Sequence, residues 1–286
     1  PILPMILVNG AEGIGTGYST SIPKFKLDDV KKSIINKLEN DKFLQIYPNY
    51  EKFKGQIQKL DSQNYLSTGK YIIDENKITI TELPIGIWTE DYKHFLENLY
   101  DKANWIKKIK NNSTEIDINF EIYTKEPIKE STKLIDILKL SKKISLSNMH
   151  CFNSKGKLQK YSSALDILNE FYDIRLDAYE KRKLHQIEML KLQIFIEESK
   201  QKFIQAIISN KLQLHKIDDE KIPKVLDSMK LYKKNGYDYL LNMPARSQSK
   251  SSILASESKI SNLKKELGRI KKLTSKELWL NDLSKI

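Results

Sequence analysis

A regular hydrophobic pattern covers the C-terminal part of the chain. From Ser163 onward, apolar residues recur at steps of three, four or multiples of seven, and no glycine lies between Gly156 and Gly236. This spacing predicts one long helix, because it places the apolar side chains on a single face. The positions are Leu165, Leu168, Tyr172, Leu176, Tyr179, Ile187, Leu190, Ile194, Ile204 and Ile208.

A second helical stretch near the end of the chain repeats this spacing. Its apolar positions are Ile253, Ile260, Leu263, Leu267 and Ile270. Two such helices bury their apolar faces by pairing, so we expect an antiparallel coiled coil. Residues 218–244 contain Pro223, Gly236 and Pro244 and cannot form one rod, so shorter helices are predicted at this tip.

The middle of the chain mixes helical and strand patterns. A helix capped by Asp28 or Asp29 is predicted through Asn40, with Val30, Ile34, Ile35 and Leu38 on one face. Strand patterns follow at Phe53–Leu60, Lys70–Ile73, Lys77–Glu82, Asp117–Tyr123 and Lys143–Phe152, and helices are predicted at Thr89–Asp101 and Ser131–Leu138. The predicted fold class is therefore α+β, followed by a long antiparallel coiled coil with a helical tip.

These patterns divide the chain into three parts, residues 1–25, 26–160 and 161–286. In the first part the apolar run Met5–Val8 is predicted to be a strand. We expect this part to be loosely held, because a strand needs partners.

The stretch Val8–Ser19 (VNGAEGIGTGYS) contains four glycines within eight residues. Glycine permits close approach of the backbone to a bulky partner, but the spacing is not G-x-G-x-x-G and no Gly-Lys-Ser/Thr follows. A tight turn is the simpler interpretation. Ile14 lies between two glycines, so it either fills a core or projects as a wedge.

Composition favours an acidic partner. The 286 residues carry a formal net charge of +12 and a pI near 9.3, which favours polyanions such as nucleic acid. A merely lysine-rich surface is the alternative. No apolar run is long enough to cross a bilayer, so no membrane partner is expected.

The sequence shows no catalytic or metal-binding arrangement. The single cysteine, Cys151, excludes an intramolecular disulfide and fits a reducing compartment. The four histidines are scattered, without metal-ligand spacing. His150 and Cys151 are adjacent on a predicted strand and therefore point to opposite faces. We expect no catalytic residue and no metal site.

At the same time, Pro1–Pro23 (PILPMILVNGAEGIGTGYSTSIP) resembles the segment that follows the active-site tyrosine in type II DNA topoisomerases, nearer the eukaryotic and large-virus branch than gyrase. Further similarity follows in the family's order, at YEKFKGQI (50–57), LPIGIWTEDYK (83–93), NMHCFNSKGKLQKY (148–161), LDILNEFYDIRLDAYEKR (165–182) and YDYLLNMP (237–244). These segments span nearly the whole chain.

The resemblance implies the C-terminal part of the DNA breakage-reunion core. Residues 1–25 would end the winged-helix DNA-gate region, 26–160 would be the tower (shoulder) domain, and 161–286 the coiled coil and exit gate. The parent enzyme would pass one duplex through a break in another, in the nucleus or in a cytoplasmic viral factory. In this family the nucleophilic tyrosine, the Mg²⁺ site and the ATPase precede this region, so we expect this chain alone to be inactive and to hold no cofactor.

The resemblance also implies partners and site residues. Double-stranded DNA is the expected ligand, and the isoleucine matching Ile14 wedges between base pairs and bends the duplex. The expected DNA-binding residues are Gly13, Ile14, Gly15, Thr16, Lys24, Lys26 and Lys54, with Lys107, Lys108 and Lys110 among further candidates. Homodimerisation is expected through Tyr237, Tyr239, Leu240, Leu241 and Met243. Trp88 and Trp105 are interpreted as packing residues.

Two other functions fit the residues less well. One is a free-standing basic DNA-bending or coiled-coil scaffold protein. The other is a nucleotide-dependent enzyme that uses the glycine stretch.

Overall fold

The computed structural model describes residues 1–128, 132–244, 247 and 249–286. It divides into two compact units, Pro1–Ile174 and Arg175–Ile286. The α+β class with a long helix, expected from the sequence, is confirmed. The division into three parts at residues 25 and 160 stays a prediction.

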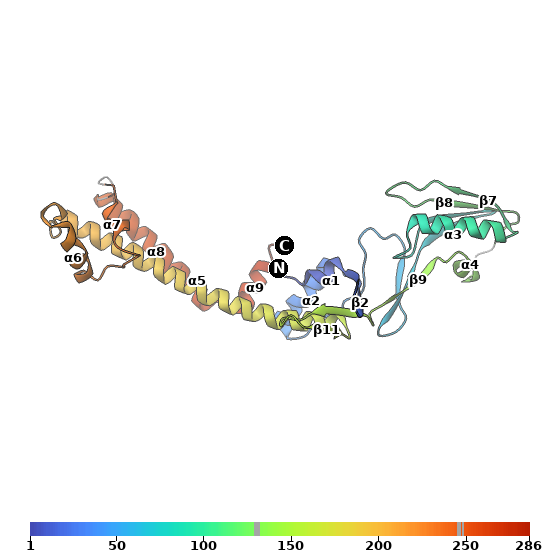
Figure 1. Cartoon of the computed structure of the whole chain (residues 1–286), viewed down its shortest axis with the longest axis horizontal. Helices are drawn as coiled ribbons and strands as arrows, with labels where there is room; N and C mark the ends of the chain where they lie inside the picture. The colour runs from blue at the N-terminus through green and yellow to red at the C-terminus, as the bar shows by residue number, and fades with distance from the viewer. Residues whose placement is uncertain (129–131, 245–246, 248) are drawn as a thin grey trace. The chain divides into compact units, whose positions relative to one another are not determined.

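The first unit begins with a short helix and a hairpin (Figure 1). Helix α1 (Met5–Asn9) is followed by strands β1 (Ala11–Gly15) and β2 (Tyr18–Ile22), which pair antiparallel. The prediction of a strand at Met5–Val8 is wrong. Periodicity does not distinguish helix from strand in so short an apolar run. Leu3 and Leu7 are buried, so this part is packed rather than loosely held.

Helix α2 (Leu27–Asn40) buries Val30, Ile34 and Leu38, as its apolar spacing predicts. Its cap differs from the prediction, because Lys26 occupies the N-cap without a side-chain hydrogen bond. Asp28 and Asp29 lie in the first turn, where their charges favour the positive end of the helix dipole.

Two antiparallel sheets form the α+β part of this unit. A three-stranded sheet has the order β3-β4-β9, with β3 (Gln56–Lys59), β4 (Asn64–Thr68) and β9 (Ser141–Ser145). A four-stranded sheet has the order β5-β6-β8-β7, with β5 (Lys70–Asp74), β6 (Lys77–Glu82), β8 (Phe120–Thr124) and β7 (Ile106–Asn111).

One face of the four-stranded sheet carries the core. Helix α3 (Thr89–Lys102) lies along β7 and β8 (Figure 1), and α4 covers Thr132–Ile137. The strands alternate, so Ile78, Ile80 and Ile122 are fully buried in the same cluster as Leu96 of α3. Both helices agree with the predictions, although Ser131 lies outside the described residues.

The predicted strand Lys143–Phe152 is two strands, β9 and β10 (Met149–Phe152). Strand β10 leaves the sheet and pairs with β11 (Leu158–Tyr161). The sequence pattern does not predict strands β4, β7 and β11, because their segments carry too few apolar residues to show a period of two.

The long helix α5 (Ala164–Ile208) is confirmed, and the second unit contains its C-terminal part. Helix α8 (Lys250–Lys272) runs antiparallel to α5, as predicted. Glu197 contacts Lys259 while Gln201 contacts the earlier Glu257, and farther back along α5 Tyr179 reaches Asp282 of α9 (Ser275–Leu283).

Short helices form the tip of the second unit. They are the 3₁₀ turns at Leu214–Lys216 and Asp219–Lys221, α6 (Ile222–Ser228) and α7 (Asp238–Leu241). Phe203, Leu226 and Leu240 are fully buried in their common core. Nowhere in the described ranges is a helix long and apolar enough to span a bilayer.

A buried carboxylate links α5 to α8. Glu197 accepts hydrogen bonds from Lys259 (2.8 Å) and Lys200 (3.1 Å). Burial raises the pKa of Glu197, but these hydrogen bonds and charges outweigh it and hold the pKa below its usual value. The ion pairs therefore stabilise the fold above the unfolded-state pKa of about 4.3, and this stabilisation is lost as pH falls through the folded-state pKa.

We therefore expect the free energy of unfolding of the second unit to decrease below about pH 4. Glu197→Gln should lower it by about 2 kcal/mol at neutral pH, because hydrogen bonds to a charged group are lost, and should flatten part of the acid dependence. Urea unfolding followed by circular dichroism measures both effects. Glu266→Gln is the control, since Glu266 is exposed in a 3.9 Å pair with Arg269. An unchanged acid dependence in Glu197→Gln would contradict the assignment.

Candidate nucleic-acid interface

The glycine stretch forms a β-hairpin with a two-residue turn. Ile14 pairs with Ser19 and Gly15 with Tyr18, so the turn consists of Thr16 and Gly17. Gly17 has a φ of +83°, a conformation that residues with a side chain rarely adopt. The hairpin places its glycines in strands and in a turn between strands, rather than in a loop that leads into a helix N-terminus, as phosphate-cradling motifs require.

Ile14 projects from this hairpin. Its side chain is 95% exposed. Of the two interpretations left by the sequence, the structure therefore excludes the core residue and leaves the projecting one. Apolar side chains presented in this way are the kind that architectural DNA-binding proteins insert between base steps.

The two glycines beside Ile14 have different surroundings. A Cβ added to Gly13 would meet nothing within 4 Å. A Cβ added to Gly15 would lie 2.6 Å from the ring of Tyr18. Tyr18 therefore fills the space that a side chain on Gly15 would occupy, whereas the space beside Gly13 is empty.

A polar pocket of about 340 Å³ lies at the foot of the hairpin. Lys24, Lys142 and Lys143 line it, together with Glu12 and Tyr50. Three cations against one carboxylate favour an anion such as a phosphodiester. We call Lys24, Lys142 and Lys143 the foot lysines.

Two contacts order the walls of this pocket. The Nζ of Lys142 donates a hydrogen bond of 2.6 Å to the carbonyl oxygen of Gly86, which fixes the lysine against the Pro84–Ile87 turn. Burial raises the pKa of the Tyr50 hydroxyl, which also receives a hydrogen bond from the backbone N–H of Lys24.

The other expected DNA-binding lysines are engaged with carboxylates. Lys26 lies 3.8 Å from Asp28, and Lys54 lies 2.7 Å from Asp117, a hydrogen bond that raises the pKa of Lys54. Both pairs are exposed, so each contributes little stability and a phosphate can compete for the cation. Thr16 is exposed in the hairpin turn. Sequence reasoning missed Lys142, because nothing in the sequence places it beside Lys24.

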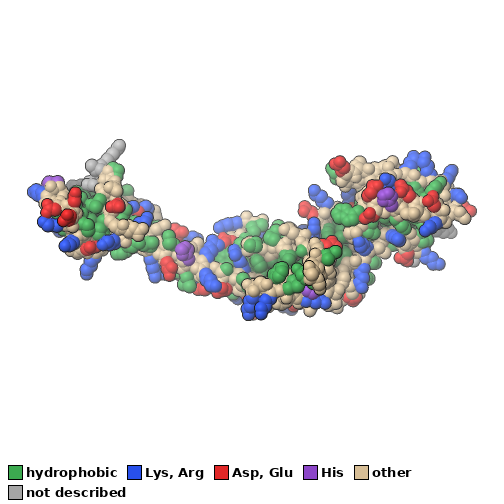
Figure 2. Space-filling model, viewed as in Figure 1, with side chains coloured by type: hydrophobic (Ala, Val, Ile, Leu, Met, Phe, Trp, Pro, Cys, Tyr) green, Lys and Arg blue, Asp and Glu red, His purple; other side chains and the backbone are tan. Residues whose placement is uncertain are grey.

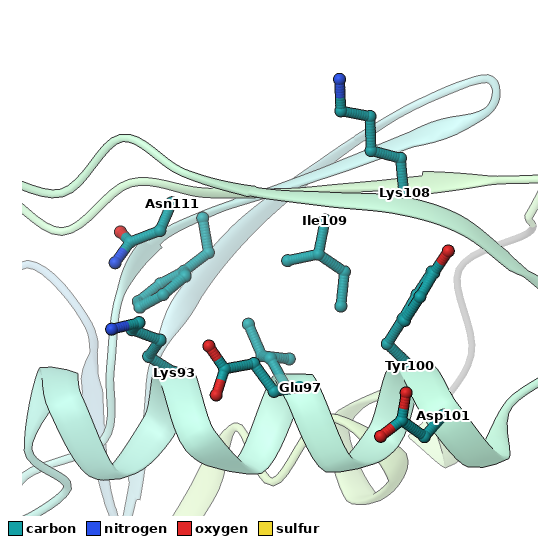
Figure 3. Close-up of a pocket in the computed structure, with 9 residues that line it drawn as sticks. Lys93, Glu97, Tyr100, Asp101, Lys108, Ile109 and Asn111 are labelled. Atoms are coloured by element: carbon teal, nitrogen blue, oxygen red, sulfur yellow. The ribbon is translucent and has the colours of Figure 1, made fainter.

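The net positive charge does not by itself locate an interface. On the face shown in Figure 2, Lys and Arg side chains are scattered among acidic ones. A groove of about 460 Å³ lies between α3 and β7, and its lining contains two lysines, Lys93 and Lys108, and two carboxylates, Glu97 and Asp101 (Figure 3). Lys110 lies over the ring of Tyr123 instead. This groove therefore lacks the charge imbalance of the foot pocket.

The tryptophans differ from one another. Trp105 is half-buried against the core of the four-stranded sheet, as expected. Trp88 is 75% exposed, so it is not a core residue of this unit, and its packing against another domain stays a prediction. It is the N-cap residue of α3, where the chain leaves the Pro84–Ile87 turn. Apolar residues precede it in the sequence, as they do many buried residues.

The expected dimer residues come together at the tip of the second unit. Tyr237 and Leu240 are buried in the tip's own core, and the hydroxyl of Tyr237 donates a hydrogen bond of 2.6 Å to Asp227. Tyr239 and Met243 pack partly against the same core. Leu241 is 36% exposed and thus presents apolar surface.

No group of three His, Cys, Asp or Glu side chains that fits a metal ion occurs among the described residues.

Comparison with known proteins shows the family of this chain. Residues 1–284 match the A-subunit family of DNA gyrase/topoisomerase IV. DNA topoisomerase 2 of Plasmodium falciparum is 34% identical over 100% of this chain and 23% of its own length. DNA topoisomerase 2 of Invertebrate iridescent virus 6 is 32% identical, over 99% of this chain and 26% of its own length. The chain therefore spans about a quarter of these relatives.

A solved structure shares the fold. The crystal structure of the Plasmodium falciparum topoisomerase II DNA-binding, cleavage and re-ligation domain matches with a TM-score of 0.84 and 33% identity. The match covers 100% of this chain and 43% of that one. The chain belongs to the A-subunit family of DNA gyrase/topoisomerase IV and is homologous to the breakage-reunion region of type II DNA topoisomerases.

Proposed function

We propose that this chain is the DNA-bending and exit-gate part of an ATP-dependent type II DNA topoisomerase. The hairpin β1–β2 inserts Ile14 between stacked base pairs of a duplex, and the foot lysines hold the flanking phosphates. The exposure of Ile14 between two glycines carries this proposal, because a fully solvated isoleucine gains nothing until it is buried by a partner.

The energetics of insertion divide the work between two kinds of residue. Unstacking a base step costs a few kcal/mol, which a bent duplex offsets through more extensive contact with the protein. Affinity comes mainly from phosphate contacts and falls with salt. Ile14 therefore governs the bend, and the lysines govern the strength of binding.

The chemistry of strand cleavage belongs to other parts of the parent enzyme. In the family to which this chain is homologous, the Mg²⁺ site and the ATPase precede this region, and we place both in those parts of the parent enzyme. By itself this chain holds and bends DNA without cleaving it. The parent acts in the nucleus, or in a viral factory if it is viral.

The tip of the second unit binds the tip of a second copy. Leu241 is 36% exposed and offers apolar surface to the second copy, and Tyr239 and Met243, partly buried against the core of the tip, add to it. Tyr237 and Leu240 support this surface from within the tip.

Ile14→Ala in the parent enzyme should abolish most DNA bending, measured by energy transfer between dyes at the ends of a duplex. Affinity at fixed salt should change little, since the phosphate contacts remain. Ile116→Ala is the matched control, because Ile116 is 91% exposed outside the hairpin. Wild-type bending by Ile14→Ala would reject the proposal.

The foot lysines should determine part of the salt dependence. Lys24→Gln combined with Lys143→Gln should reduce the slope of log affinity against log salt by about 2, because each lost phosphate contact removes about 0.9. Lys93→Gln combined with Lys108→Gln, in the balanced groove, should leave the slope unchanged. An equal slope in both double variants would show that the pocket does not hold phosphate.

Light scattering should find a dimer of this chain that Leu241→Glu converts to monomers, since a buried charge at an apolar interface is costly. Leu184→Glu, at a 54% exposed position on α5, should leave the dimer intact. Leu240→Glu is not a clean test, because Leu240 is fully buried in the tip. A Leu241→Glu dimer, or a monomeric wild-type chain, would refute this interface.

A further inference from the structure

The hairpin that carries Ile14 is attached to a segment about 130 residues away in the sequence. Thr20 Oγ1 donates a hydrogen bond of 2.7 Å to the carbonyl oxygen of His150 and accepts one of 3.1 Å from its backbone N–H. The backbone N–H of Ser21 donates to the carbonyl oxygen of Asn148 at 2.8 Å. Three hydrogen bonds therefore attach β2 of the hairpin to residues 148–150, where β10 begins.

Side chains continue this attachment toward the turn. The Nδ2 of Asn148 donates a hydrogen bond of 2.8 Å to the hydroxyl of Ser19, the cross-strand partner of Ile14. Asn148 is held in turn, because its Oδ1 lies 3.0 Å from Nδ1 of His150. The strand opposite Ile14 is thus fixed by contacts to β10.

The ring of Tyr18 makes a further contact, with Gly15 of β1. Its ring atoms lie 2.6 and 2.7 Å from the position of a Cβ on Gly15, so the ring covers the α-carbon of Gly15 directly. Its centroid lies 6.3 Å from that of His150. Tyr18 therefore lies between the residue that follows Ile14 and the strand that anchors the hairpin.

A wedge needs such support. A two-stranded hairpin is at best marginally stable alone, and each glycine beside Ile14 adds backbone freedom that must be given up on insertion. Gly13 is open on its side, whereas Gly15 is covered by Tyr18. The restraint on Ile14 thus acts through Gly15.

We propose that Tyr18 is a positioning residue that sets the direction of Ile14 by packing its ring on Gly15 and resting on β10. This inference rests on the proposed function of Ile14 as a wedge. It assigns the two glycines different constraints: Gly15 must lack a side chain because the ring lies against it, whereas Gly13 has room for one.

The test uses the parent enzyme and two readouts, the bent fraction at saturating DNA and the affinity. Tyr18→Ala should lower the bent fraction roughly tenfold, because one or two backbone residues must then be ordered at the moment of insertion. Affinity should stay near the wild-type value, since the foot lysines are unchanged. Tyr18→Phe should restore bending, because the ring, rather than the hydroxyl, contacts Gly15.

The glycines supply the matched pair. Gly15→Ala should reduce bending as Tyr18→Ala does, because the new methyl group displaces the ring, and Gly13→Ala should bend DNA normally. The double variant Gly15→Ala/Tyr18→Ala should bend no less than Tyr18→Ala alone, since both changes remove the same contact.

Two results would overturn the inference: normal bending by Tyr18→Ala, or equal losses in Gly13→Ala and Gly15→Ala. If Ile14→Ala abolishes bending while Tyr18→Ala does not, the wedge stands and the positioning role fails. If Ile14→Ala itself bends DNA normally, the proposed function fails.

Discussion

The hydrogen bonds between β2 and residues 148–150 are the constraint on which the interface depends. They attach the glycine-rich hairpin to a segment about 130 residues away in the sequence, which supports it from outside. The intervening α+β part must fold for Asn148 and His150 to reach the hairpin. The hairpin therefore combines freedom of the glycine backbone at its turn with rigidity at its base, as the proposed insertion of Ile14 into a stacked duplex requires.

The same long-range folding produces the positive pocket. Strand β9 pairs with β4 and brings Lys142 and Lys143 beside Lys24, while Lys142 is fixed by the carbonyl oxygen of Gly86. Five segments of the chain, residues 9–12, 21–24, 50, 85–86 and 142–145, thus meet at the foot of the hairpin. In the proposed interface, Ile14 and the foot lysines belong to one site, because residues 141–150 supply Lys142 and Lys143 from β9 and support the hairpin through β10.

Local periodicity was sufficient for the long elements and insufficient for the site. The apolar spacing of α2, α3, α5 and α8 is visible in the sequence because each helix repeats its pattern over several turns. Met5–Val8 was too short to distinguish helix from strand, and polar strands such as β7 showed no alternation. Ile14 was recognisable from its two glycines and the family resemblance. Lys142 was not, because its place beside Lys24 depends on tertiary contacts. The contact of Tyr18 with Gly15 was not either, because the sequence pattern did not predict the hairpin that pairs them. Trp88 misled because exposure cannot be inferred from residue type.

The distribution of tryptophans makes the two units optically distinguishable. Trp279 is fully buried and stacks on Tyr179 with ring centroids 5.6 Å apart, whereas Trp88 faces solvent and Trp105 is half-buried. Indole emission shifts to longer wavelength in water, so the short-wavelength edge of the fluorescence spectrum reports on the helical unit and the long-wavelength edge on the α+β unit. The unfolding of either compact unit can therefore be followed by intrinsic fluorescence in a single sample, without any added label.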